Sequence, residues 1–205
     1  AIGNYFTGRI MNALGRKRVL LLGWTLALPI PWLLIWAPDW NWVVFSNVLL
    51  GLSQGFTWSA TIVMKIDLVG PKDRGFAMGL NEFAGYFAVG IMAFVTGHIA
   101  NKYGIHPYPF YIGIGIAFLG WIISAIWVKD THHFVVHESE TDHTMALKSV
   151  FKETTFTNKT LSSVTQAGLV NNLNDGMIWG LFPLFLLGLG FSLEVVAVLT
   201  AIYPS

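Results

Sequence analysis

The residues best suited to chemistry are polar side chains that interrupt long apolar stretches. The clearest group lies in residues 160–193, where Asp175 stands among Asn171, Asn172 and Trp179. At helical spacing Asn171 and Asp175 are i, i+4 neighbours, and Asn172, Asp175 and Trp179 share one face. A carboxyl group in hydrocarbon must be neutral, paired or in water. Two interpretations follow: Asp175 handles an ion or a proton, or it stabilises a kink through internal hydrogen bonds.

The sequence Asn174-Asp175-Gly176 is typical of a turn in water, yet it falls near the middle of this apolar stretch. Broken or kinked helices in transporters lie at the bilayer midplane, where freed backbone groups meet the substrate. We therefore predict a break or kink here, with Pro183 adding a second bend.

Two other apolar stretches carry polar residues. Between residues 40 and 68 they follow helical spacing along one face: Asn47, Gln54, Trp58, Thr61 and Lys65. Such a face lines a water-filled cavity or holds neighbouring helices together, and both interpretations stay open.

The next apolar stretch contains Glu82 and Tyr86 near its start. Lys65 is a candidate partner for Glu82, because a short turn at residues 70–75 would make the two helices antiparallel neighbours. A static ion pair and a role in coupling or substrate binding are both compatible with this placement.

These side chains need membrane helices to position them. A bilayer requires about 20 apolar residues per helical span, and the charge-free runs meet this length. We predict complete spans near residues 19–38, 42–68, 76–100, 109–128 and 161–188. Residues 1–7 are expected to end an earlier helix and residues 193–205 to begin a later one. The predicted fold class is an all-α polytopic membrane helix bundle.

The composition agrees with a lipid environment. Of 205 residues, 54% are hydrophobic and 11% are charged, against roughly 25% charged in soluble domains. The apolar content excludes disorder, and the absence of cysteine excludes a disulfide scaffold. With 12 cations against 11 anions, a basic nucleic-acid binder is also excluded.

The central hydrophilic segment, residues 129–160, contains histidines and acids without a metal-ligand spacing, and we interpret it as a solvated linker. A short amphipathic helix is expected near its end, around residues 145–152. No cofactor, metal or catalytic residue is predicted.

Loop cations define the expected topology. Lysines and arginines concentrate in residues 8–18, 70–75 and 129–160, which the positive-inside rule places in the cytoplasm. Tryptophans and tyrosines near residues 36–42 and 103–111 would form an aromatic belt at the outer surface of the plasma membrane.

One cytoplasmic segment resembles a known family. Residues 8–18 read GRIMNALGRKR, similar to the G-x-L-a-D-R-x-G-R-[RK] loop of the major facilitator superfamily. Asn12 replaces the usual Asp, and the matching positions include Gly8, Gly15, Arg16 and Lys17. Residues 67–75, from Asp67 through Arg74, resemble the turn between helices 4 and 5 of the same family.

The resemblance implies a transporter, its central part extending from the end of helix 2 to early helix 8. Residues 1–128 would belong to the N-terminal six-helix half, 129–160 to the central loop and 161–205 to the C-terminal half. It also implies that Arg16 and Asp67 join a cytoplasmic gate. We expect secondary active transport of a small solute by alternating access, with an ion or proton as coupling partner. A non-transporting membrane sensor or assembly protein on the same fold is the alternative; oligomeric state stays open.

Overall fold

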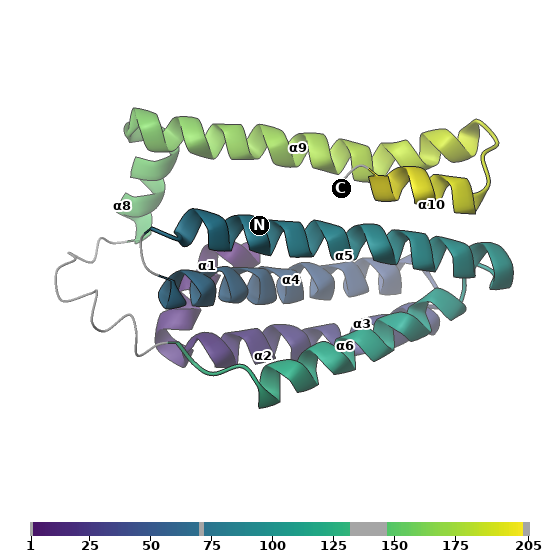
Figure 1. The fold of residues 1–205 in the computed structure, drawn as a ribbon, viewed down its shortest axis with the longest axis horizontal. Helices are drawn as coiled ribbons and strands as arrows, with labels where there is room; N and C mark the ends of the chain where they lie inside the picture. Colours follow the sequence, from purple (N-terminus) through teal and green to yellow (C-terminus); the bar gives the residue numbers. More distant parts are fainter. Residues whose placement is uncertain (1, 70–71, 132–146, 203–205) are drawn as a thin grey trace.

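The computed structural model describes residues 2–69, 72–131 and 147–202, which form helices joined by short connections. The long helices run antiparallel, side by side, along the longest axis of the molecule (Figure 1). The elements are α1 (Ile2–Leu14), α2 (Arg16–Ala27), α3 (Pro29–Ile35), α4 (Trp40–Leu68), α5 (Arg74–Tyr103), α6 (Tyr108–Ile126), α8 (Leu147–Lys152), the π-helical turn η2 (Glu153–Thr157), α9 (Lys159–Gly188) and α10 (Leu193–Ile202).

Residues 8–18, which the sequence predicts to be a loop, lie almost entirely in helices. Helix α1 continues to Leu14 and α2 begins at Arg16, so Gly15 alone separates them. Gly15 has φ +88°, a conformation that L side chains rarely adopt, and this lets the chain reverse within one residue.

The predicted span 19–38 is divided into two helices and begins and ends three residues earlier than expected. Helix α2 ends at Ala27, α3 follows from Pro29 to Ile35, and Leu28 joins them in a helical conformation. Proline has no N–H to donate and its ring crowds the preceding turn, so the division falls where Pro29 stands. The pair still provides 20 residues, Arg16–Ile35, that are long and apolar enough to cross a bilayer.

The other predicted spans match helices to within a few residues. Two of them, α5 and α6, are long and apolar enough to cross a membrane, as is the α2–α3 pair. Helices α4 and α9 have sufficient length, 29 and 30 residues. Polar residues lower the mean hydropathy of α4 and α9, so these two helices are long enough to cross a membrane but less apolar than the other three candidates.

The predicted break in residues 161–188 is wrong. Helix α9 is continuous from Lys159 to Gly188, through Asn174-Asp175-Gly176 and Pro183. The polar side chains bond within the helix: Asn172 Nδ2 donates to the carbonyl of Gly168 at 2.8 Å, and Asn171 Nδ2 to Asp175 Oδ2 at 3.4 Å. These residues favour turns in water because their side chains bond nearby backbone, and here the same bonds form inside the helix.

A small core forms where α1, α2 and α4 meet. It contains Met11, Val19, Leu20, Ala60 and Met64. The α1 hydroxyl of Thr7, fully buried, donates to the carbonyl of Gly55 on α4 at 3.4 Å. Elsewhere large apolar side chains point outward, including Phe83, Phe87 and Phe94 of α5, as expected for helices that face lipid or further helices.

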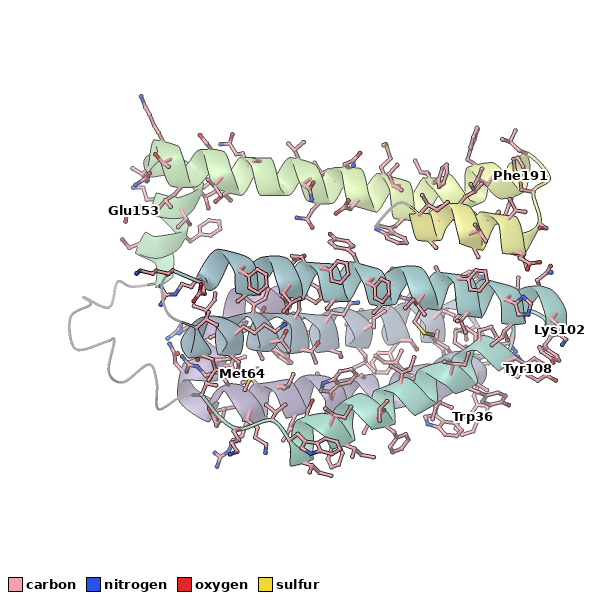
Figure 2. All side chains as sticks on the ribbon, in the orientation of Figure 1. Trp36, Met64, Lys102, Tyr108, Glu153 and Phe191 are labelled. Atoms are coloured by element: carbon pink, nitrogen blue, oxygen red, sulfur yellow. The ribbon has the colours of Figure 1, made fainter. Side chains whose placement is uncertain are left out.

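Aromatic rings gather at one end of the bundle. Figure 2 shows Trp36, Lys102 and Tyr108 close to one another at that end, with Met64 at the opposite end. Tyr108 packs against Tyr103 and Tyr111, with ring centroids 5.5 and 6.3 Å apart. Rings of this kind favour the interface between hydrocarbon and water.

The last two helices join the rest mainly through α5. Helix α10 lies alongside α5, while α9 runs along the edge of the molecule and packs on α10 and η2 (Figure 1). A Cβ at Gly97 of α5 would collide with Ala197, so the two backbones approach closely. At the aromatic end, His98 Nδ1 and Asn101 Nδ2 each lie 3.4 Å from the carboxylate of Glu194.

The end of the predicted linker is helical, in α8 and η2, as expected for residues 145–152 from Leu147 onward. The histidine- and acid-rich residues 132–146 lie outside the described residues.

Candidate functional site

A cavity of about 500 Å³ lies between α4, α5 and α9. It contains both aromatic and amide side chains, and the polar stretches singled out in the sequence meet there. Its lining residues are Gly51, Gln54, Gly55, Thr57, Trp58, Gly85, Tyr86, Val89 and Asn172.

Helix α4 supplies one wall because its other face is fixed against α2. Gly23 of α2 allows this contact: a Cβ there would lie 2.7 Å from Thr57 Cγ2 and 3.0 Å from the carbonyl oxygen of Ser53. Gln54 and Trp58, one turn apart, are then directed to the cavity side, and Trp58 keeps 40% of its surface exposed.

Helix α5 forms the second wall, and a glycine sets its distance from α4. A Cβ at Gly85 would lie 2.5 Å from Cη2 of Trp58, so the indole ring rests directly against the α5 backbone. The neighbouring residue Tyr86 also lines the cavity.

Helix α9 closes the third side with Asn172 and, beside it, Asp175. Asp175 lies one helical turn beyond Asn172 on α9 and interacts with Tyr86, and Glu82 lies one turn before Tyr86 on α5. Two acidic residues from different helices are therefore neighbours of residues that line the cavity.

The remaining predicted pathway residues do not line this cavity. Asn47 Nδ2 donates to the carbonyl of Val43 at 2.9 Å, and Thr61 Oγ1 to that of Trp58 at 2.9 Å, both within α4. Asn171 is exposed on α9, and Trp179 is half-buried one turn beyond Asp175.

The predicted pairing of Lys65 with Glu82 is wrong. Lys65 Nζ donates to Oδ1 of Asn81 at 2.6 Å, and among the described residues it forms no ion pair with Glu82. Asn81 is buried, whereas Glu82 is half-buried on the adjacent position of the helix. A one-residue step turns a helical side chain by about 100°, so only one of the two can face Lys65.

A second cluster forms where α1 and α4 end and α2 begins. Arg16 Nε lies 3.3 Å from Asp67 Oδ2, with the two side chains 4% and 9% exposed. Arg16 Nη1 also donates to the carbonyl of Met11 and to Oδ1 of Asn12, each at 3.3 Å. A buried arginine is thus held by one carboxylate and by the end of the preceding helix.

Other residues of the resembling motif surround this cluster. Lys17 Nζ donates to the carbonyl of Ala125 at 2.8 Å, which connects α2 to the end of α6. Gly8 is exposed on α1, and half-buried Arg74 begins α5.

The sequence did not single out Thr57, Val89 or Thr131. Thr131, which is 2% exposed, donates from Oγ1 to Asp67 Oδ2 at 2.7 Å and so ties the segment after α6 to Arg16. A single threonine at the start of the charged central loop forms no recognisable motif. Its contact with Asp67 depends on the path that the chain takes after α6.

Comparison with known proteins decides the family. The model of the Major Facilitator Superfamily matches residues 1–204. This chain belongs to the major facilitator superfamily. The family consists of membrane transporters that are generally not enzymes, and the candidate spans of α2–α3, α5 and α6 agree with an integral membrane protein.

A curated relative is the proton-coupled antiporter flippase LtaA of Staphylococcus saprophyticus subsp. saprophyticus. It is 27% identical over 125 residues, which are 60% of this chain and 30% of that protein. No solved structure gives a significant match.

Proposed function

We propose that this chain is the central part of a secondary active transporter that moves a small solute by alternating access, coupled to protons. Residues 1–128 belong to its N-terminal half, 129–160 to the central loop and 161–205 to the C-terminal half. The cavity between α4, α5 and α9 is the solute site.

The observation that carries this proposal is the composition of that cavity. Its walls come from α4 and α5 on one side and from Asn172 of α9 on the other. In alternating access the solute binds between two bundles that rock about it. A polar cavity shared by segments so distant in sequence fits that requirement.

Proton coupling is supported by the carboxyl groups that face Tyr86. A carboxyl group in a partly dry cavity can exchange a proton as water enters and leaves. We assign this role first to Asp175 and second to Glu82. The name of the curated relative, a proton-coupled antiporter, points the same way.

The Arg16–Asp67 cluster is proposed as the cytoplasmic gate. The described parts of the segments predicted to be cytoplasmic, residues 8–18, 72–75 and 127–131, lie at the same end of the bundle (Figure 1). The aromatic end is then the outer surface. The gate holds the outward-open state through the buried Arg16–Asp67 pair, which separates when the cytoplasmic side opens.

Flux measurements on the full-length protein in vesicles test the transport function. An imposed proton gradient should drive solute movement, and Asp175→Asn should abolish that dependence. Asp73→Asn, which removes an exposed carboxylate before α5, is the matched control and should leave it intact. Unchanged proton-driven flux in Asp175→Asn would contradict the assignment of Asp175. Absence of flux for every solute in a broad screen would contradict transport itself.

A further inference from the structure

The chemistry of the cavity between α4, α5 and α9 also indicates a class of solute. Building on the proposed function, we infer that the site takes an amphipathic monovalent organic cation, such as an alkyl- or aryl-substituted ammonium. Aromatic rings and neighbouring acidic side chains carry this inference.

Two aromatic rings line the cavity from facing helices. Trp58 of α4 and Tyr86 of α5 both contribute, and Trp58 is held against Gly85 with 40% of its surface exposed. Tryptophan is the strongest aromatic partner for a cation, because its ring face carries negative electrostatic potential. The same rings offer apolar surface to the hydrocarbon part of a ligand.

Acidic side chains lie one helical turn from two of the lining residues. Glu82 precedes Tyr86 by four positions on α5, and Asp175 follows Asn172 by three positions on α9. The nearest cation along α4 is Lys65, seven residues beyond Trp58, and its ammonium group donates to Asn81. Seven residues correspond to roughly 10 Å along a helix, so Lys65 is displaced from the ring pair.

The polar lining provides acceptors for an ammonium group. Asn172 donates an amide N–H to the carbonyl of Gly168 at 2.8 Å, and its oxygen Oδ1 can accept. Thr57 donates its hydroxyl to the carbonyl of Ser53 at 2.8 Å, and its oxygen can accept as well. Gln54 and Trp58 also bring N–H donors to the lining, so the aromatic rings and the acidic neighbours are what favour a cation.

Matched probes of opposite charge provide the test. Tetraphenylphosphonium and tetraphenylborate carry the same four phenyl rings around a positive or a negative centre. Equilibrium binding to the full-length protein in lipid nanodiscs should be saturable for the phosphonium and nonsaturable for the borate. Displacement of bound phosphonium by a neutral alkyl glucoside is measured in parallel and should be negligible.

Substitutions then localise the site. Trp58→Ala should weaken phosphonium binding about 10- to 30-fold, since a desolvated cation–π contact contributes about that factor. Trp58→Phe, which keeps an aromatic face, should recover most of the affinity, whereas Trp58→Leu should not. Trp127→Ala removes a tryptophan that is 69% exposed beyond α6 and serves as the control. Asp175→Asn should weaken the phosphonium and leave the borate unaffected.

The outcomes separate this inference from the proposed function. Equal affinity for both ions, displacement by the glucoside, or equal affinity of Trp58→Phe and Trp58→Leu would overturn the cation site. If proton-driven flux of a neutral solute persisted in that case, the transport function would stand. Saturable phosphonium binding together with an absence of proton-linked flux would support the cation site and contradict the proposed transport function.

Discussion

At the scale of single residues, Arg16 combines full charge with almost complete burial. Its guanidinium group is 4% exposed and contacts Asp67, Asn12 and the carbonyl of Met11. Burying two charges costs much of what their attraction returns, so such a pair adds little net stability. Removing one partner is different, because the other charge then stays buried without it.

We predict that Asp67→Asn destabilises the full-length protein by about 3–5 kcal/mol, the range found when one member of a buried pair is removed. The loss of the carboxylate also deprives Thr131 of its charged acceptor. Thermal unfolding in detergent should show the lower Tm. Asp73→Asn, at an exposed position, should unfold like the wild type; equal Tm values for both variants would contradict the prediction.

The two glycines of the charged motif should respond oppositely to alanine. At Gly15 the positive φ costs an L residue about 1–2 kcal/mol, and a Cβ would lie 2.5 Å from Asp130 Oδ2. At Gly8, inside α1, nothing lies within 4 Å of a Cβ, and alanine gains about 1 kcal/mol of helix propensity. Gly15→Ala should therefore lower the Tm, and Gly8→Ala should maintain or raise it. If both variants shifted the Tm in the same direction, the break between α1 and α2 would not depend on having a glycine at position 15.

At the scale of elements, backbone proximity holds α5 against α10 more than charge does. The His98–Glu194 contact is exposed, with side chains 56% and 45% accessible, and contacts of this kind contribute under about 1 kcal/mol. Gly97 against Ala197 instead permits close packing over several turns, as small residues do between membrane helices.

We accordingly predict that Gly97→Ala separates α5 from α10, whereas Glu194→Gln leaves them together. Spin labels on exposed Tyr103 and Val195 would report the distance between the helices. Gly79→Ala, where nothing lies within 4 Å of the added Cβ, is the control on α5. A longer distance in Glu194→Gln than in Gly97→Ala would show that the polar contact dominates.

At the scale of the whole molecule, the proposed alternating access requires α5 and α10 to move relative to each other, because α10 joins α9 to the bundle. We predict that a reducible bifunctional thiol reagent that joins His98→Cys to Glu194→Cys stops solute flux in the full-length carrier. The tips of the native side chains lie 3.4 Å apart, and the shorter cysteines need a spacer to span that gap. Residues 1–205 contain no cysteine of their own.

Reduction of the cross-link should restore flux, and each single variant should transport in the presence of the reagent. Complete cross-linking with undiminished flux would mean that this contact stays closed throughout the cycle.

The helical spans follow from sequence because lipid imposes a length and an apolar composition on every membrane helix. The starts and ends of α4, α5, α6 and α9 could thus be predicted to within a few residues. The family could also be identified, since the spacing of Gly8, Gly15 and Arg16 lies within one contiguous segment.

Contacts between helices depend on rotation about each axis, which local patterns do not specify. Lys65 donates to Asn81 and not to Glu82, because these two successive residues point in directions about 100° apart around the axis of α5. Asn174-Asp175-Gly176 is helical within α9, where the side chains of Asn171 and Asn172 bond inside the helix, an outcome that turn preferences in water do not anticipate.

The sequence by itself determined that these residues cross a membrane as helices of a transporter family, because hydropathy and a contiguous motif carry that information. The tertiary structure alone decided that Trp58, Tyr86 and Asn172 share one cavity beside Asp175, and that Thr131 reaches Asp67. The residues that share the cavity are 28 to 114 positions apart, from 58 to 86 and from 58 to 172. Only the packing of helices against one another fixes which faces meet.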